Sequence, residues 1–308
     1  MNFKVATIIL NYNSYEDTIF CYNDLKKQKN INMLLILVDN ASTDDSRKRL
    51  MDFFKNKDFA LFTEDKNLFE FLDKDKVYNH PIDTILIFNS VNKGYSAGNN
   101  IGIKIADYLN IDLVLIANPD MRFHDPFYLQ KLVETISLDE DFVIAASRII
   151  NLQGEEQNPL REPNFFEELF WPSQTIRKFF NKKTTYILPY NNEIMFVPKV
   201  QGCCLMLRID FLKKIGYLDE NLFLYSEEAV LAAQVKKLRK KIVFNPKIYA
   251  IHEHKNKGNN SKRMLLMIKS RKYYLKNYSN YNAFQIVLLD ISYSLLTLVH
   301  WIKCKFLL

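Results

Sequence analysis

Short runs of apolar residues alternate with longer stretches of mixed polarity along the first 120 residues of the chain. Runs of about four to eight apolar residues are typical of strands buried on both faces, and the longer stretches suit helices. This alternation favours an α/β fold with a mainly parallel sheet and right-handed crossovers. The predicted strands are Val5–Leu10, Leu34–Val38, Ile85–Phe88 and Leu113–Ile116, and the predicted helices are Tyr15–Gln28, Ser46–Lys55 and Ser96–Leu109.

The remaining chain has a less regular pattern. Residues 57–81 lack a clear period and are interpreted as an insertion, either irregular or helical. Residues 155–195 are rich in Phe, Asn and Pro, which indicates loops and short helices. Beyond them, the sequence predicts strands over Val197–Leu207 and Ile242–Phe244 and helices over Phe211–Ile215 and Glu227–Leu238.

Three polar segments follow predicted strands: Val38–Ser46, Asn92–Asn100 and Ile116–Asp120. In open α/β sheets, ligands bind at the carboxyl ends of the strands. Acidic, amide and glycine residues gathered at that edge suit a nucleotide diphosphate and a divalent cation.

The first two segments predict the nucleotide side of such a site. Asp39 can accept a hydrogen bond from a pyrimidine base or from ribose, with Asn11 and Asn13 lining the same pocket, although this segment also suits a turn and a helix N-cap. Gly94 and Gly98 permit close backbone approach to a phosphate at a helix N-terminus. Their spacing does not match a dinucleotide or P-loop motif, and a tight turn is the simpler alternative.

Carboxylates and histidines further along predict a metal and a general base. Asp120 after its strand can hold Mg²⁺ or Mn²⁺ against substrate phosphates, although Asn-Pro-Asp is also an ordinary turn. Glu227 and Glu228 open a predicted helix, where the helix dipole stabilises them and where one of them can act as a general base. His252 and His254 suit metal or phosphate contacts.

The formal net charge of +7 is unevenly distributed. A basic cluster occupies residues 236–241, and residues 255–276 contain eight Lys or Arg and no Asp or Glu. The apolar segment Phe284–Leu308 follows, with Asp290 inside it. Because a mid-membrane charge costs about 2.5–3.5 kcal/mol, we expect an interfacial helix or a helix docked on the protein or a second subunit. We favour a membrane surface over nucleic acid as the partner of the basic run.

The four cysteines include no Cys-x-x-Cys pair, which predicts reduced, buried thiols in a cytoplasmic protein. No basic and then apolar leader precedes the first strand, so we expect no secretory signal.

Read in order, the motifs resemble those of the family 2 inverting glycosyltransferases of the GT-A fold, and most closely their rhamnosyltransferase-like branch. The resemblance covers residues 4–276. The matching segments are Asn11-Tyr12-Asn13, Val38–Ser46, Asn92–Asn100, Asn118-Pro119-Asp120, Gly216–Glu220, Phe223–Glu228, Pro246 and His252.

The resemblance implies a role for each matching position. Glu228 stands where the family carries the catalytic base, which deprotonates the acceptor hydroxyl. Asp120 and His252 are implied as metal ligands, and Asp219 and Glu227 as residues of the acceptor side. Donor binding is implied for Asn11, Asn13, Asp39, Asn40, Asn92, Gly94, Gly98 and Asn99.

Three positions depart from the family pattern: Glu228 replaces the usual Asp, and Val230 and Gln234 stand where an acid and an Arg are common. The implied organisation is a GT-A catalytic domain over residues 1–255, divided into a nucleotide-sugar half, 1–120, and an acceptor half, 121–255. A basic and apolar helical extension over residues 256–308 follows.

The sequence thus predicts a metal-dependent inverting glycosyltransferase at the inner face of the cell membrane. Its donor would be dTDP-rhamnose or a UDP-hexose, and its acceptor a growing bacterial surface polysaccharide or a lipid-linked glycan. A homodimer is compatible with the apolar extension. The alternatives are a non-catalytic nucleotide-sugar binder in an assembly complex and a nucleotidyltransferase, but the latter would carry a Gly- and Lys-rich loop after the first strand.

Overall fold

The computed structural model describes residues 3–63, 83–170, 186–254 and 260–306. The strands are β1 Val5–Asn11, β2 Met33–Asp39, β3 Ala60–Thr63, β4 Thr84–Phe88, β5 Leu113–Ala117, β6 Met121–Arg122, β7 Phe142–Asn151, β8 Met195–Val197, β9 Cys204–Arg208 and β10 Lys241–His252. The helices are α1 Tyr15–Lys26, α2 Ser46–Phe54, α5 Tyr95–Tyr108, α6 Tyr128–Ile136, α7 Phe165–Leu169, α9 Ile209–Ile215, α10 Glu227–Lys237, α11 Asn260–Asn277 and α12 Ala283–Phe306.

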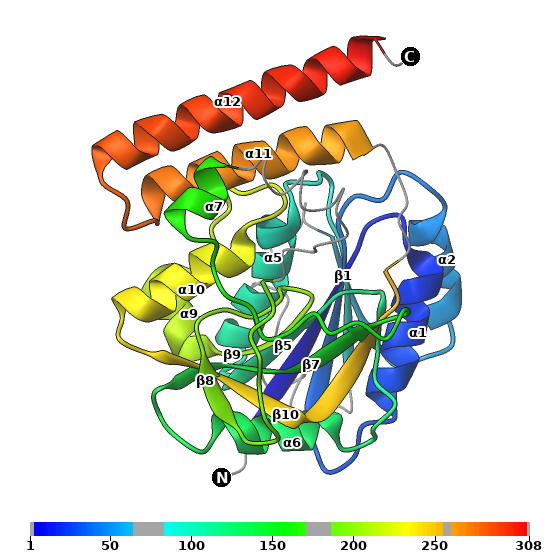
Figure 1. Cartoon of the computed structure of the whole chain (residues 1–308). Helices are drawn as coiled ribbons and strands as arrows, with labels where there is room; N and C mark the ends of the chain where they lie inside the picture. The colour runs from blue at the N-terminus through cyan, green and yellow to red at the C-terminus, as the bar shows by residue number, and fades with distance from the viewer. Residues whose placement is uncertain (1–2, 64–82, 171–185, 255–259, 307–308) are drawn as a thin grey trace.

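The strands form one twisted sheet in the order β3-β4-β2-β1-β5-β9-β7-β10-β6, with β8 paired to β10 (Figure 1). The five strands from β3 to β5 are parallel, as the alternating pattern predicts. β9 runs antiparallel between β5 and β7. The parallel strands place all their carboxyl ends on one edge, which is the edge that carries the polar loops.

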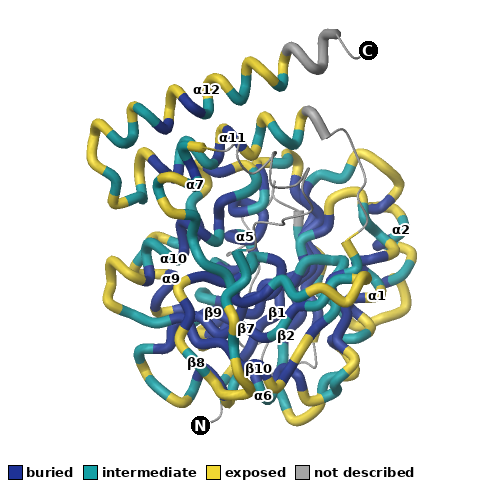
Figure 2. The backbone as a smooth tube through the Cα atoms, in the orientation of Figure 1, coloured by how far each residue is buried: buried dark blue, intermediate teal, exposed yellow. Residues whose placement is uncertain are grey.

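Helices cover both faces of the sheet and divide its core into two layers. Along β1, Ala6 and Ile8 pack in the layer that includes α5, α9 and α10. Val5 and Ile9 point the other way, into the layer that includes α1, α2 and α6. Figure 2 shows these strands as the buried centre of the molecule. Burial on both faces explains why the strands read as continuous apolar runs.

One predicted strand and the predicted insertion differ from the observed structure. The prediction of a single strand over Val197–Leu207 is wrong. The segment divides into the end of β8 and most of β9, which pair with different neighbours. Pro198 and Gly202 lie in the break, and both residues weaken a strand interior. Within the predicted insertion, the start is a strand, β3, which extends the parallel edge, while residues 64–82 lie outside the described residues.

The two C-terminal helices add a further layer beside α7 and α10 (Figure 1). Tyr274 and Leu275 of α11 and Leu289 of α12 are buried against Val230 of α10. The α11 residue Arg271 forms ion pairs with the carboxylates of two residues from the segment before and within α7, Glu162 and Glu168. These contacts attach α11 and α12 to α7, to α10 and to the segment before α7.

Candidate active site

The first two loops at the sheet edge bring Asn11 and Asp39 together, since β1 and β2 end opposite each other. The Asp39 side chain is buried and accepts hydrogen bonds from Asn11 Nδ2 at 2.7 Å and from the Ser42 hydroxyl at 2.6 Å. Arg47 Nε lies 3.6 Å from the same carboxylate. Asn13 fixes the facing loop, because its Oδ1 accepts from a backbone N–H of the loop after β2 at 2.8 Å. The predicted nucleotide side is therefore one connected cluster.

The asparagines of the second cluster hold the loops after β2 and β4 together. Asn40 Nδ2 donates to Asn92 Oδ1 at 3.0 Å and to the Gly94 carbonyl at 3.1 Å, and Asn40 Oδ1 accepts from Asn89 at 3.0 Å. Asn99 is fully buried in α5 and donates to a backbone carbonyl one turn earlier. These amides fix the backbone of the loops after β2 and β4.

Close packing against other parts of the protein explains why Gly94 and Gly98, the two glycines predicted to approach a phosphate, have no side chain. A Cβ at Gly94, where φ is +103°, would lie 2.4 Å from the Phe223 carbonyl oxygen. A Cβ at Gly98 would lie 2.6 Å from Leu10 Cδ1. The glycines thus allow the start of α5 to approach β1 and the loop before α10, and a phosphate contact at either position stays a prediction.

The third loop forms a cluster of possible metal ligands. Asp120, His252 and His254 each offer one ligand atom, and these three atoms lie within 4.8 Å of one another. Asp120 Oδ1 is 3.3 Å from His252 Nε2, and Asp120 Oδ2 is 3.3 Å from His254 Nδ1. Two imidazoles and one carboxylate suit a divalent transition metal such as Mn²⁺.

The surroundings of this cluster leave its lone pairs available. The Gln157 side-chain oxygen accepts a hydrogen bond from His252 Nδ1 at 2.7 Å. The lone pair of Nε2, on the other side of the buried ring, is therefore available to a metal ion. Neither His252 Nε2 nor Asp120 Oδ1 has a hydrogen-bond partner among the described residues. A bound cation would satisfy both unpartnered atoms, so these residues fit a divalent metal.

Arg122 fixes the two segments that carry these ligands. β6 pairs with the end of β10, which sets the residue after Asp120 opposite His252. The buried guanidinium of Arg122 donates to the Pro119 carbonyl at 2.9 Å, and it lies 3.0 Å from Asp17 and 2.9 Å from Glu253. Arg122 therefore joins the Asn-Pro-Asp turn to the histidine segment and to α1.

The segment before α10 presents the two adjacent glutamates. Tyr225 and Ser226 have φ values of +75° and +69°, and consecutive left-handed residues of this kind store strain at functional sites. Glu227 is buried, and burial, followed by the charge of Glu228, raises the pKa of Glu227 to about 8. Glu228 is half-buried in the first turn of α10. The more accessible of the two carboxylates is thus Glu228, the predicted base.

Tyr95 connects the base segment with the metal segment. Its hydroxyl lies 3.1 Å from Asn118 Oδ1 and 2.9 Å from the Gly202 carbonyl. Asn118 belongs to the turn that carries Asp120, and a Cβ at Gly202 would lie 3.9 Å from Glu228 Oε2. The predicted base and the predicted metal ligands therefore border the same region.

Asp219, which we predicted on the acceptor side, is engaged by the C-terminal helices. Its Oδ2 accepts from the hydroxyls of Tyr273 at 2.8 Å and Tyr278 at 2.7 Å. One turn earlier in α11, the Ser270 hydroxyl donates to the Leu224 carbonyl at 2.7 Å. The helical extension thus supports the loop that leads to the two glutamates, and Asp219 is its anchor.

Sequence reasoning left several residues of this region unassigned. The sequence predicts metal or phosphate contacts for both histidines, but the family resemblance implies only His252 as a metal ligand, and the structure adds His254 to the cluster. Gln157, Asn89 and Arg122 carry no motif, and their roles depend on contacts with residues far away in the chain.

Comparisons with known proteins agree with this architecture. Residues 7–216 match the family model for glycosyl transferase family 2. The low-salt glycan biosynthesis hexosyltransferase Agl10 of Haloferax volcanii is 26% identical over 227 residues, which are 73% of this chain and 59% of Agl10. The chain therefore spans less than two thirds of the length of this relative.

Two solved structures share the fold at low sequence identity. Mannosyltransferase PcManGT from Pyrobaculum calidifontis, solved with GDP-Man and Mn²⁺, gives a TM-score of 0.57 at 13% identity, covering 94% of this chain and 69% of that one. GalNAc-T7, solved with UDP, GalNAc and Mn²⁺, gives a TM-score of 0.58 at 12% identity, covering 94% and 54%.

The order of the strands and the helices on both faces of the sheet define a GT-A-like α/β fold. Because the family model matches more than half of the chain, the protein belongs to glycosyltransferase family 2. Glu228, His252 and His254 lie beyond the matched residues, so their roles depend on the geometry described above.

Proposed function

We propose that this glycosyltransferase transfers a hexose or rhamnose from a nucleotide-sugar donor to a glycan acceptor, with inversion at the anomeric carbon. The observation that carries the proposal is the convergence of the Asp39 cluster, the Asp120–His252–His254 cluster and Glu228 at one sheet edge. The donor is dTDP-rhamnose or a UDP-hexose. The acceptor is a growing surface polysaccharide or a lipid-linked glycan, in line with the glycan biosynthesis role that the name of Agl10 records.

In this proposal, the chain's own groups divide the work. Asp39, oriented by Asn11 and Ser42, binds the base or ribose. Asp120 and the two histidines hold Mg²⁺ or Mn²⁺, which would neutralise the diphosphate as it leaves. Glu228 accepts the proton of the acceptor hydroxyl as that oxygen attacks the anomeric carbon and the bond to the diphosphate breaks.

The base assignment is tested with Glu228→Gln, which keeps the shape and removes the proton acceptor. Transfer should fall by about 10²–10⁴, while donor affinity measured by calorimetry stays within about twofold. The matched control is Glu227→Gln. If Glu228→Gln retains full transfer and Glu227→Gln does not, the base has been assigned to the wrong carboxylate.

The metal assignment is tested with Asp120→Ala and Mn²⁺ calorimetry in the presence of UDP and dTDP. Loss of metal-dependent nucleotide binding, with unchanged melting of the apo protein, is the expected result. Unchanged binding would remove Asp120 from the metal site. A thermal-shift screen of dTDP-rhamnose and UDP-hexoses with Mn²⁺ then identifies the donor.

A non-catalytic nucleotide-sugar binder is the competing proposal, and the departures at Glu228, Val230 and Gln234 favour it. Donor hydrolysis or transfer with a panel of acceptors separates the two, because a non-catalytic binder would bind the donor without turning it over.

We further propose that the protein binds the cytoplasmic face of the membrane peripherally through α12. Of the described residues, only Ala283–Trp301 form a helix long and apolar enough to cross a membrane. One face of α12 is packed: Leu289 is buried, and the Ser292 hydroxyl donates to the Leu169 carbonyl at 2.8 Å. The opposite face is an exposed apolar stripe, with side chains 51–72% exposed, formed by Phe284, Val287, Ile291, Leu295, Leu298 and Trp301.

The contacts of α12 favour an interfacial position over a spanning one. Asp290 pairs with Lys272 of α11 at 2.7 Å, and these charges would be costly inside a bilayer. Lys262, Lys269 and Lys276 recur every seven residues on one side of α11 and can meet anionic head groups. A docked helix and an interfacial helix are compatible here, because the packed face of α12 contacts the protein while its exposed apolar stripe is available to the membrane.

Vesicle flotation tests the attachment. Ile291→Glu with Leu295→Glu should abolish binding to vesicles that contain phosphatidylglycerol, whereas Leu138→Glu with Leu152→Glu, at exposed leucines elsewhere, should not. If the stripe variant floats normally and instead converts a dimer into a monomer in sedimentation experiments, the stripe is a homodimer interface and the membrane proposal is wrong.

A further inference from the structure

A second concave surface lies away from the sheet edge, along the later turns of α10. This groove has a volume of about 1350 Å³, which exceeds the usual range of about 300–1,000 Å³ for small-molecule sites. Its walls come from the end of α9, the C-terminal half of α10, the start of β10 and the turn between α11 and α12. The size and the open length suit an extended ligand.

The charge of the groove is strongly one-sided. Among the residues that the structure describes, the one carboxylate in the lining belongs to Glu162, and it is neutralised by Arg271 at 2.7 Å and by Lys199 at 2.6 Å. Two lining lysines at the start of β10 pair with acidic residues outside the groove. Four exposed lining cations have no ion-pair partner in the part of the chain that the structure describes: Lys214, Lys236, Lys237 and Arg239.

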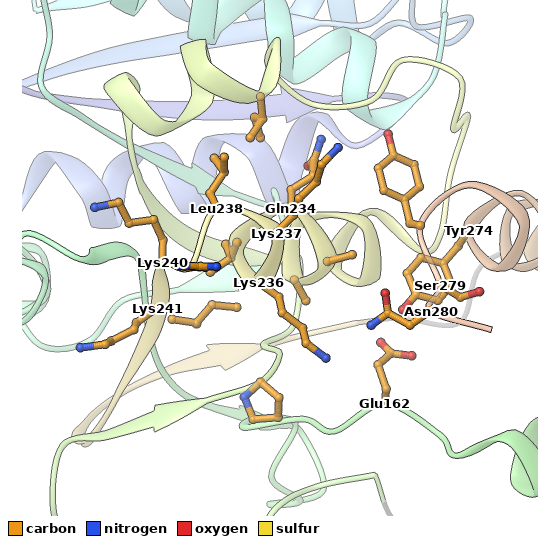
Figure 3. A pocket seen from close by; sticks show the side chains of 18 of the residues that line it. Glu162, Gln234, Lys236, Lys237, Leu238, Lys240, Lys241, Tyr274, Ser279 and Asn280 are labelled. Atoms are coloured by element: carbon orange, nitrogen blue, oxygen red, sulfur yellow. The ribbon is translucent and has the colours of Figure 1, made fainter. Parts of the chain in front are cut away.

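The other polar groups of the groove suit sugar hydroxyls. The end of α11 contributes the amide of Asn277, the turn after it contributes the amide of Asn280 and the ring of Tyr281, and α10 contributes the amide of Gln234. Figure 3 shows Lys236 extending from α10 toward the side on which Glu162 and Asn280 lie. Amides offer both donors and acceptors to hydroxyls, and an aromatic ring offers an apolar face to a sugar ring.

The groove lies on the same helix as the predicted base. Glu228 is in the first turn of α10 and Lys236 is eight residues later, which corresponds to about 12 Å along the helix axis. Gln234, which lines the groove, also lines a small cavity beside Glu227. The predicted base and the groove therefore lie on one helix, about two turns apart.

We propose that this groove binds an anionic stretch of the oligosaccharide acceptor, several sugar units from the reacting hydroxyl. The proposal rests on the glycosyltransferase function above, but the groove binds without donor or metal. The proposal therefore predicts that an acidic oligosaccharide binds to the protein in the absence of donor and metal. Salt should weaken this binding, and neutralising the acid groups of the oligosaccharide should abolish it.

The test uses fluorescently labelled tetragalacturonate, with its methyl ester as the neutral probe and tripolyphosphate as the sugar-free anion. Anisotropy titration should show at least tenfold weaker tetragalacturonate binding by Lys236→Glu with Arg239→Glu. The matched control is Lys29→Glu with Lys55→Glu, an equal charge change at exposed lysines in the nucleotide half, and it should stay within twofold.

Three outcomes would overturn the proposal. The first is that both charge-reversal variants lose tetragalacturonate affinity equally. The second is that the methyl ester binds the parent protein as tightly as tetragalacturonate does. The third is that the parent protein binds tripolyphosphate but does not bind tetragalacturonate. UDP and dTDP binding with Mn²⁺ should be unchanged in the groove variant, and this measurement separates a failure of the groove proposal from a failure of the proposed function. Thermal melting of each variant confirms that the comparison is between folded proteins.

Discussion

Glu227→Gln should change the pH dependence of stability in a direction that burial of this carboxyl group determines. Glu227 is 9% exposed, and its pKa is raised to about 8 from 4.5 by burial first and then by the charge of Glu228. Between these two pKa values the folded state binds more protons than the unfolded state, so the stability of the protein falls as pH rises from about 4.5 to about 8.

The size of the effect follows from the same shift. One pKa unit corresponds to about 1.4 kcal/mol, so the carboxyl group costs the folded state about 3 kcal/mol at pH 7 and about 5 kcal/mol well above pH 8. Below pH 4.5 the cost vanishes. Glutamine keeps the shape and removes the titration, but its amide N–H groups need partners in the buried site, at a cost of about 1–2 kcal/mol.

At pH 8 the carboxyl group costs about 4 kcal/mol, so the net expectation for Glu227→Gln is a gain in stability of about 2–3 kcal/mol at pH 8 and a small loss at pH 5. Urea unfolding of the mutant and the parent protein at both pH values measures this, and Glu140→Gln, at an exposed position, should change neither. A Glu227→Gln effect with the same sign and size at pH 5 and pH 8 would refute the reasoning, because it would show that the folded state does not hold this carboxyl group protonated.

Three further substitutions test the supporting contacts. Arg122→Met should weaken Mn²⁺ binding about 10–100-fold in calorimetry, because the guanidinium joins the Asp120 turn to the histidine segment; unchanged affinity would contradict this positioning role. Asp219→Asn should lower the free energy of unfolding by about 1–3 kcal/mol through weaker tyrosine hydrogen bonds, and an unchanged urea midpoint would be inconsistent with the anchor role. Arg271→Met should lower the free energy of unfolding by about 3–5 kcal/mol, because it leaves the buried Glu168 carboxylate without its cationic partner, and Glu168→Gln in the same protein should recover part of this loss.

The local pattern of apolar and polar residues was sufficient to predict four of the parallel strands and the position of two site residues. The apolar runs of β1, β2, β4 and β5 locate the parallel half of the sheet to within about one residue at each end, because strands buried on both faces have no alternation to obscure them. Asp39 and Asp120 could be placed at one edge from sequence alone, since parallel strands bring their carboxyl ends together. The order of the motifs also indicated the family, which the family model confirms.

Tertiary structure decided what depends on distant partners. The division of Val197–Leu207 between two strands follows from pairing with β10 and β5, which no local propensity encodes. The reason for Gly94 is the backbone of Phe223, more than a hundred residues away. The two faces of α12 are both partly apolar in sequence, and only packing against α11 and α7 determines which face is buried and which is left as the exposed stripe. Long-range contacts of this kind are set by the complete fold, whereas strand periodicity is set by neighbouring residues.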